Sequence, residues 1–177
     1  MIYFVRHGES EANLRGVFAG QRENSVLTEK GRQQAMDTAQ AIKRDVPFKI
    51  ERIICSPLKR ALETAEIITK ELGLPLEMIE IDNAITEYDM RSLTGTPIHK
   101  ISSSALVTAK EAENPYFFRD RVFLSFKGFS DRRENVLIVS HAGVGRILET
   151  FRLKKDAKLF YDLPAYDNAS VTWIDWL

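Results

Sequence analysis

With 177 residues, the chain is long enough to form one domain with a sizeable core. Its 25 Lys and Arg residues balance its 25 Asp and Glu residues, whereas a protein that coats nucleic acid or an anionic bilayer usually has a basic excess. The single Cys55 excludes an internal disulfide framework, no run approaches the roughly 20 apolar residues that span a bilayer, and the first residues lack a signal-peptide pattern. We therefore expect a cytoplasmic protein that binds neither nucleic acid nor a membrane.

Short apolar runs alternate along the chain with longer periodic segments. The short runs predict strands, and apolar residues that recur every three or four positions predict amphipathic helices. In chain order, the predicted elements are a strand at 2–5, a helix over 35–46, a strand at 52–55, a helix over 58–72, a weaker strand at 77–81, helices over 98–109 and 118–129, a strand at 136–140, a helix over 144–151 and a strand at 170–176.

Capping signals mark the ends of two of these helices. Ser56 and Pro57 are typical of an N-cap and a first-turn proline for the helix over 58–72, and Gly73 is typical of its end. Thr96 and Pro97 give the same start signal for the helix over 98–109. Together with the helix over 118–129, this gives a short helical cap segment near 96–135.

Strands that alternate with helices predict an α/β fold, in which a mostly parallel central sheet carries helices on both faces. The last strand would join an edge of the sheet in either direction, with Trp173 and Trp176 packing it on the core. We expect a single domain over residues 1–177, present as a monomer or a homodimer.

Polar side chains gather where the predicted strands end. Arg6 and His7 follow the first strand, Ser56 to Arg60 follow the second, and Ser140 to Gly143 follow the fourth, while Glu87 lies in a loop after the weaker strand. The carboxyl ends of strands in an open α/β sheet meet at one crevice, where ligands bind. The sequence therefore predicts one site built from two histidines, two arginines and a carboxylate.

His7 is the candidate nucleophile of this site. A neutral imidazole nitrogen can attack phosphorus, provided that the other ring nitrogen donates a hydrogen bond, and Gly8 would let a backbone carbonyl come close enough to accept it. The alternative is a histidine that merely packs in the core. Arg6 beside it, and a second histidine after another strand, favour the catalytic interpretation.

The remaining groups match the needs of phosphoryl transfer. Arg6, Arg60 and His141 would hold the phosphoryl oxygens, although Arg60 alone could also be an exposed helical arginine. A carboxyl would protonate the leaving alkoxide and later activate water, and the spacing does not separate Glu87 from Asp89 for this role.

His7, His141 and Glu87 also fit a two-histidine, one-carboxylate metal set. The neighbouring arginines would repel a cation, so we expect no metal.

With these residues in place, the chain resembles the histidine phosphatase superfamily, also called the phosphoglycerate mutase-like family. The segments that carry the resemblance run through nearly the whole chain: Phe4 to Ser10 with Asn13, Phe18 to Gly20, Leu27 to Ala35, Ser56 to Ala61 with Thr64 and Ala65, Glu87 to Gly95, and Val139 to Gly143. Arg91 and Ala142 depart from the pattern, because many members have glycine at both positions.

The resemblance implies that His7 is phosphorylated, that Arg6, Arg60 and His141 form its pocket, and that Glu87 donates the proton. It also implies that Asn13, Ala19, Gly20 and Ala142 lie near the phosphate or substrate, and that no metal or organic cofactor is needed.

Segment 96–135 shows no basic cluster of the kind that mutases of the family carry, so we expect a phosphatase acting on small metabolite or sugar phosphates. The alternatives are mutase-type transfer, a phosphohistidine-protein phosphatase, and a non-catalytic phosphate-binding module, which Arg91 motivates. Arg15, Arg22, Arg91 and Lys100 are candidates for binding a second anionic group or are solvated surface.

Overall fold

The computed structural model describes residues 1–132 and 134–176. Arg133, which falls inside the predicted cap segment 96–135, and Leu177, the last residue of the predicted domain, lie outside the described residues. Within the described part of the chain, no helix is both long enough and apolar enough to cross a membrane.

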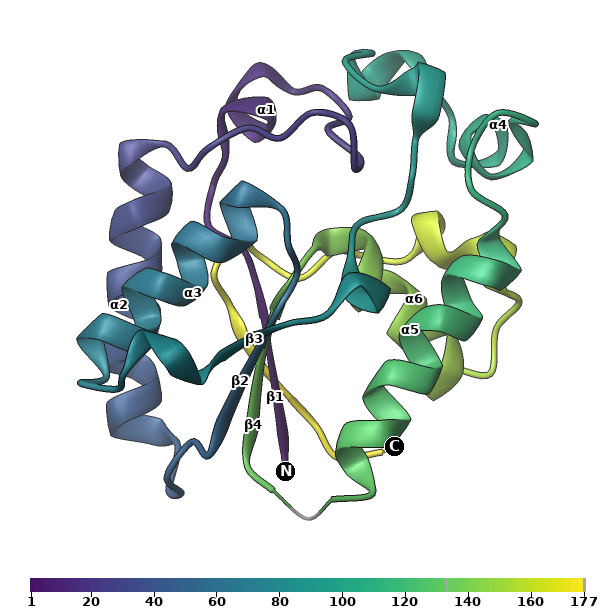
Figure 1. Ribbon diagram of the computed structural model, residues 1–177. Coiled ribbons are helices and arrows are strands. Elements are labelled where there is room, and N and C mark those ends of the chain that lie inside the picture. The colour runs from purple at the N-terminus through teal and green to yellow at the C-terminus, as the bar shows by residue number, and fades with distance from the viewer. Residues whose placement is uncertain (133, 177) are drawn as a thin grey trace.

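A mostly parallel five-stranded sheet forms the centre of the described structure (Figure 1). The order of the strands is β3-β2-β4-β1-β5, and β5 alone runs antiparallel, beside β1 at one edge. This arrangement confirms the predicted fold class and gives the last strand its direction. The strands are β1 (Ile2–Arg6), β2 (Arg52–Cys55), β3 (Ile79–Ile81), β4 (Val136–Ser140) and β5 (Val171–Ile174).

Helices cover both faces of this sheet, as predicted (Figure 1). The α-helices are α1 (Glu11–Arg15), α2 (Glu29–Asp45), α3 (Lys59–Glu71), α4 (Ser103–Thr108), α5 (Pro115–Ser130) and α6 (Ala142–Arg152). Short 3-10 helices join them: η1 (Leu76–Met78), η2 (Asn83–Ile85), η3 (Arg91–Leu93), η4 (Ile98–Lys100) and η5 (Ala157–Asp162).

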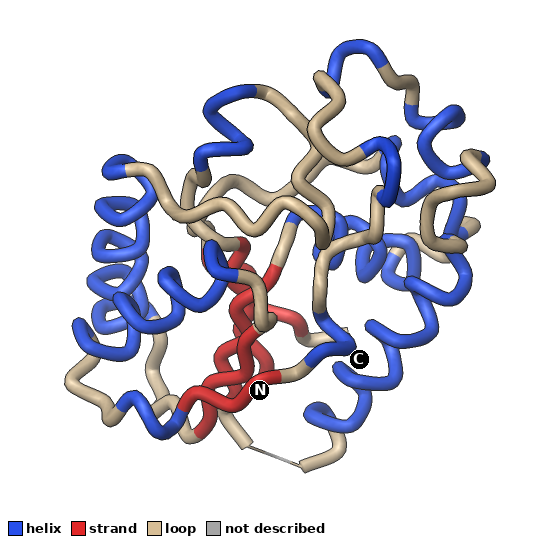
Figure 2. The backbone as a smooth tube through the Cα atoms, turned by 45° about the horizontal axis from the view of Figure 1, so that its top comes forward, coloured by secondary structure: helices blue, strands red, loops and turns tan. Residues whose placement is uncertain are grey.

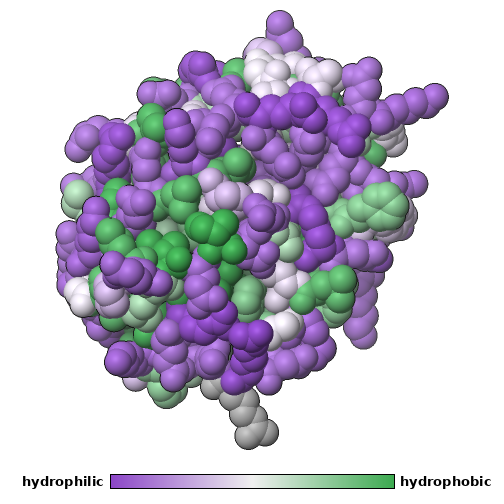
Figure 3. All heavy atoms as spheres, in the orientation of Figure 1, coloured by the Kyte–Doolittle hydropathy of each residue, from purple (hydrophilic) through white to green (hydrophobic). Residues whose placement is uncertain are grey.

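The alternation of side chains along β1 divides the core into two clusters. Tyr3 and Val5 pack with α2 and α3, whereas Ile2 and Phe4 pack with α5 and α6. Apolar side chains from the inner strands fill both clusters, so hydrophilic residues are left to cover most of the face shown in Figure 3. Helices α2 and α3 and helices α5 and α6 thus lie on opposite sides of the strands that carry the predicted site.

The predicted start of α3 at Ser56 and Pro57 is wrong. The N-cap is Leu58, which has extended backbone and makes no side-chain capping bond. Ser56 is fully buried, and its hydroxyl lies 2.7 Å from Nε2 of His141. The Ser56 side chain therefore binds His141, although the local sequence signal predicts that it caps α3. The end of α3 is as predicted, with Gly73 in the left-handed conformation at φ 71°.

Two further predictions are wrong. The helix expected over 98–109 is broken into η4 and α4, because the hydroxyl of Ser102 accepts a hydrogen bond from the backbone N–H of Ala105 and begins a new helix. Trp173 is 56% exposed on the edge strand, and only Trp176 packs against the core.

Candidate active site

Three loops meet at the carboxyl ends of β1, β4 and β2, which are neighbours in the sheet. The parallel hydrogen-bond ladder continues beyond the strands, since the N–H of His7 donates to the carbonyl of Ser140 at 2.9 Å and that of Ser56 donates to Val139 at 3.1 Å. Figure 2 shows loops gathered above this end of the sheet. The topology therefore brings the first histidine, the second histidine and the start of α3 together.

A cavity of about 230 Å³ opens at this point. All of the predicted site residues except His141 line it, and apolar side chains close the rest of its wall. The lining residues are Arg6, His7, Asn13, Val17, Phe18, Ala19, Gly20, Arg60, Glu87, Met90, Ile98, Ala142, Gly143, Arg146, Tyr161 and Ala165.

The ring of His7 is buried, and both of its nitrogens have partners. Nδ1 lies 2.7 Å from the carbonyl of Gly8, and Nε2 accepts a hydrogen bond from Nε of Arg60 at 3.2 Å. The carbonyl requires the N–H to be on Nδ1, which leaves the lone pair on Nε2. Burial, and then the charges of Arg60 and Arg6, hold the pKa of His7 well below its usual range, so the ring is neutral.

Gly8 is needed here for a second reason. A Cβ atom at this position would lie 2.4 Å from the carbonyl oxygen of Gly31 in the first turn of α2. Its backbone N–H donates to the hydroxyl of Thr64 in α3, at 3.0 Å. The turn after β1 is thus wedged between two helices, which fixes the orientation of the His7 ring.

The ring of His141 is fully buried with its centroid 5.2 Å from that of His7. Nε2 is bound to the hydroxyl of Ser56, and Nδ1 has no hydrogen-bond partner among the described residues. Burial lowers the pKa of His141 well below its usual value, with further contributions from Arg60 and His7. A neutral His141 whose Nε2 accepts from Ser56 presents an N–H on Nδ1.

Two arginines bring positive charge to the His7 ring. Arg60 is almost completely buried, and Nη1 and Nη2 donate to the carbonyls of Glu23 and Gly20 at 3.2 and 2.9 Å. Burial lowers its pKa to about 10, which still leaves it charged at neutral pH. Arg6 donates from Nη1 to the carbonyl of Tyr166 at 2.7 Å, while its buried Nε has no partner among the described residues.

Glu87 reaches the cavity from the segment after η2. Its Oε1 accepts from the N–H of Tyr88 at 2.8 Å, and its Oε2 accepts from that of Gly143 at 3.1 Å. A side chain on Gly143 would collide with this carboxylate, because a Cβ there would lie 2.0 Å from Oε1. Asp89, the alternative acid, instead pairs with Arg22 at 3.1 Å and does not line the cavity.

The other predicted site residues also reach the cavity wall. Asn13 caps α1: its Oδ1 accepts from the N–H of Ser10 at 3.1 Å and from Nδ2 of Asn168 at 3.4 Å, so its amide NH₂ is left to donate. Ala142 is the first residue of α6, whose N-terminal end borders the cavity.

Sequence reasoning missed Arg146 and Tyr161, which complete the wall. The Arg146 guanidinium lies 4.3 Å from the centroid of the Tyr161 ring, and its buried Nε has no partner among the described residues. Arg146 follows Ala142 by four positions on one helix, so the same helix face could have been inferred. Tyr161 comes from η5, which no pattern in the sequence indicates.

The four surface cations considered for a second anion lie elsewhere. Arg15 pairs with Glu23, and both Arg22 and Arg91 lie near Asp89. Lys100 is exposed on η4, and none of the four lines the cavity.

No group of three or more His, Cys, Asp or Glu side chains is placed to hold a metal ion within residues 1–132 and 134–176.

A larger cavity of about 720 Å³ lies between α2 and β5, beside the exposed Trp173. It contains none of the predicted site residues, and its wall is mainly apolar. We therefore assign the candidate active site to the smaller cavity, because its lining residues carry the chemical groups and the larger cavity has none of them.

One cavity lined by a neutral histidine, three arginines and a carboxylate, with a second neutral histidine 5.2 Å from the first, defines a class of α/β protein equipped to handle phosphoryl groups. Residues 2–177 match the sequence model of the histidine phosphatase superfamily (branch 1), and the chain belongs to that family.

Curated relatives include both phosphatases and mutases. The chain is 32% identical over 158 residues to an adenosylcobalamin/alpha-ribazole phosphatase of Salmonella typhi, covering 83% of this chain and 76% of the relative. It is 28% identical over 179 residues to a 2,3-bisphosphoglycerate-dependent phosphoglycerate mutase of Thermoplasma acidophilum, covering 97% and 84%. Among solved structures, Bacillus stearothermophilus YhfR superimposes with a TM-score of 0.81 at 26% identity, over 96% of this chain and 88% of the other.

Proposed function

We propose that the protein is a metal-independent phosphatase that hydrolyses phosphomonoesters of small metabolites or sugars through a covalent phosphohistidine on His7. The observation that carries this proposal is the state of the His7 ring: a neutral imidazole whose Nδ1 is held by the Gly8 carbonyl and whose Nε2 lone pair lies beside Arg60 at the cavity wall. An imidazole nucleophile requires this protonation state, with the proton on Nδ1 and the lone pair on Nε2.

In the first step, Nε2 of His7 attacks phosphorus and the bond from phosphorus to the ester oxygen breaks. The departing oxygen takes a proton from the carboxyl of Glu87. Arg6, Arg60 and the Nδ1–H of His141 donate to the equatorial oxygens as negative charge develops on them. The unpartnered nitrogens of Arg6 and His141 support this assignment, because buried donors normally have acceptors.

In the second step, the carboxylate of Glu87 takes a proton from water, and the water oxygen attacks phosphorus. The bond from phosphorus to Nε2 breaks, which releases inorganic phosphate and restores neutral His7 and protonated Glu87. Atoms and charge balance over the cycle without a metal. The cavity position of Glu87 and the surface ion pair of Asp89 support Glu87 as the acid and base.

The small cavity supports a substrate whose phosphate end is bound and whose remaining part is compact or extends outward. Asn13, Ala19, Gly20 and Ala142 would contact this end. The phosphatase relative named above supports hydrolysis rather than transfer between two positions of one substrate. A mutase is the second candidate, since Arg146 offers another cation in the same cavity and one relative is named as a mutase.

The direct test is hydrolysis of p-nitrophenyl phosphate in excess chelator by the protein and by its His7→Ala variant. We expect the variant to lose at least about 1,000-fold in kcat, because the nucleophile is gone. His99→Ala is the matched control, since His99 is exposed on η4. With a substrate labelled in its phosphate group, the label should be recovered on the unaltered protein after an alkaline quench, which preserves phosphohistidine. The label should be absent from His7→Ala. Full turnover by His7→Ala would refute the mechanism.

A further inference from the structure

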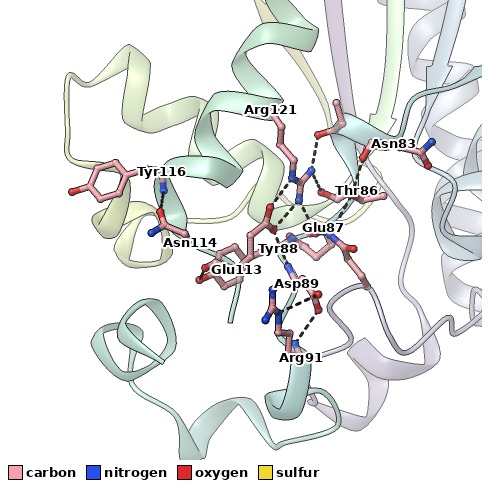
Figure 4. Close-up of polar contacts among 12 residues, drawn as sticks. Asn83, Thr86, Glu87, Tyr88, Asp89, Arg91, Glu113, Asn114, Tyr116 and Arg121 are labelled. Atoms are coloured by element: carbon pink, nitrogen blue, oxygen red, sulfur yellow. Dashed lines mark hydrogen bonds and ion pairs between the residues drawn. The ribbon is translucent and has the colours of Figure 1, made fainter. Parts of the chain in front are cut away.

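Arg121, on α5, binds the backbone of the segment that carries Glu87 (Figure 4). Nη1 donates to the carbonyls of Ala84 and Thr86 at 2.6 and 2.9 Å, and Nη2 donates to that of Glu87 at 3.1 Å. Nε and Nη2 donate to the two carboxylate oxygens of Glu113 at 2.8 and 2.9 Å. A guanidinium has five N–H groups, and here each of the five has its own acceptor.

Glu113 extends the same clamp to Asp89, at the end of the segment. Its Oε2 also accepts from the N–H of Asp89 at 3.1 Å, and its own N–H donates to the carbonyl of Asp89 at 2.9 Å. The hydroxyl of Tyr88 donates to the carbonyl of Glu113. Arg121 and Glu113 together therefore hold segment 84–89 mainly by its main chain, with the Tyr88 hydroxyl as one added side-chain contact.

The clamped segment contains the proposed acid. Two backbone N–H groups, from Tyr88 and Gly143, hold the Glu87 carboxylate, so its position follows the position of its own backbone. The Glu87 carbonyl accepts from Nε2 of Gln21 at 2.8 Å as well as from Arg121. A proton donor must meet its acceptor at hydrogen-bond distance, and a displacement of about 1 Å can cost about 100-fold in rate.

We infer that Arg121, held by Glu113, is a positioning residue that sets the Glu87 carboxyl at the departing oxygen. The inference rests on the proposed function, because it takes proton transfer by Glu87 as given. Lysine cannot replace Arg121 in this role, since an ammonium has three donors on one atom and no planar fork to span the carbonyls of a bent segment. The Arg121 side chain is 22% exposed and that of Glu113 17%, so both are largely shielded from water.

The charge of Arg121 also reaches the histidines. It contributes to the lowered pKa of His141, after the larger effects of burial, Arg60 and His7. A lysine at position 121 would keep this charge while losing the fork. The Arg121→Lys variant thus separates the positioning of the acid from the electrostatics of the pocket.

The test compares two substrates that differ in their need for an acid. An alkyl phosphate such as propyl phosphate releases an alkoxide that must be protonated, whereas p-nitrophenyl phosphate releases a phenolate that is stable near neutral pH. The quantity compared is kcat/KM, which reports the first step alone, because the second step, with Glu87 as base, is the same for both substrates. We expect Arg121→Lys to lower kcat/KM about 10- to 100-fold for propyl phosphate and less than about 3-fold for p-nitrophenyl phosphate. A protein that was simply less folded would lose both activities by the same factor.

Arg119→Lys is the matched control, because Arg119 lies on the same helix but binds Asp120 and packs on Tyr116 and Phe151 instead of segment 84–89. This variant should keep the wild-type ratio of the two activities. If Arg121→Lys does not fold by circular dichroism, Glu113→Gln replaces it, since that change removes the charge that holds Arg121 in place. It should give the same selective loss to a smaller extent, and equal losses with both substrates would overturn the inference.

Glu87→Gln separates this inference from the proposed function. If Glu87→Gln shows no selective loss with propyl phosphate, the assignment of the acid fails, and the inference fails with it. If Glu87→Gln shows the selective loss and Arg121→Lys shows equal losses or none, the inference alone is overturned. Adding Arg121→Lys to Glu87→Gln should leave the ratio of the two activities unchanged, and a further selective loss would also overturn it.

Discussion

Gly143→Ala should disable the proposed acid through a single methyl group. The new Cβ would lie 2.0 Å from Oε1 of Glu87 and 3.1 Å from its Cδ, whereas ordinary van der Waals contact begins at 3.4 Å. The carboxylate must therefore withdraw by about 1.4 Å, or α6 must shift by a similar amount. A displacement of this size corresponds to a loss of about 100-fold in kcat/KM for a substrate whose leaving group needs a proton. The crowding should also cost about 1–3 kcal/mol of stability.

The assay is steady-state hydrolysis of propyl phosphate and p-nitrophenyl phosphate, together with urea unfolding. Gly128→Ala is the matched control: Gly128 lies within α5, and a Cβ there would meet no atom within 4 Å. The control should keep both activities and gain up to about 1 kcal/mol, as expected for alanine in place of glycine in a helix. Wild-type turnover of propyl phosphate by folded Gly143→Ala would refute the proposed geometry.

Three further outcomes are expected. Arg91 has a φ of 46°, in the left-handed region that costs roughly 1–2 kcal/mol for a residue with a side chain. Arg91→Gly should therefore raise the urea midpoint of unfolding, whereas Arg91→Ala should not. Equal midpoints for the two variants would contradict this. Ser56→Ala removes the partner of His141 Nε2 and should cost about 1–3 kcal/mol by urea unfolding, and an unchanged free energy of unfolding would rule out that bond. Burial lowers the pKa of His7 and His141 below the usual 6.5, so near and below pH 6.5 the unfolded chain binds protons that the folded chain does not bind. The free energy of unfolding should therefore fall as the pH drops below 6.5, by up to about 1.4 kcal/mol per pH unit for each ring. His7→Asn should reduce this slope, and an identical slope in the variant would show that His7 does not contribute.

The sheet and most helices were predictable because their apolar residues follow the periods of strands and helices. The alternation of Tyr3 and Val5 with Ile2 and Phe4 supplies both core clusters. The site was predictable for a related reason: parallel strands place their carboxyl ends together, so residues that follow β1 and β4 had to be neighbours. The 5.2 Å between the two imidazole centroids is a consequence of that adjacency.

At two places in the site, long-range contacts decide what local signals do not. The hydroxyl of Ser56 binds His141, 85 positions away, instead of capping α3. The choice between Glu87 and Asp89 depends on Gly143 and Arg22, whose positions only the fold sets. Spacing alone carried no information on either contact.

Arg91 has an unusual backbone conformation for a residue with a side chain. Its departure from the glycine of many family members suggested an altered loop, and its φ of 46° lies in the region that glycine favours. The Arg91 backbone therefore adopts the left-handed conformation despite the side chain.

The bond between Arg60 and His7 has a consequence for the resting protein. Nε of Arg60 donates to the same nitrogen lone pair that the proposed attack would use. One lone pair cannot serve a proton donor and a phosphorus atom at once, so the guanidinium must give up this bond as an anion enters. The Nε2 lone pair is therefore occupied until an anionic substrate draws the guanidinium away. Between turnovers, the hydrogen bond would protect the ring from reaction with other electrophiles.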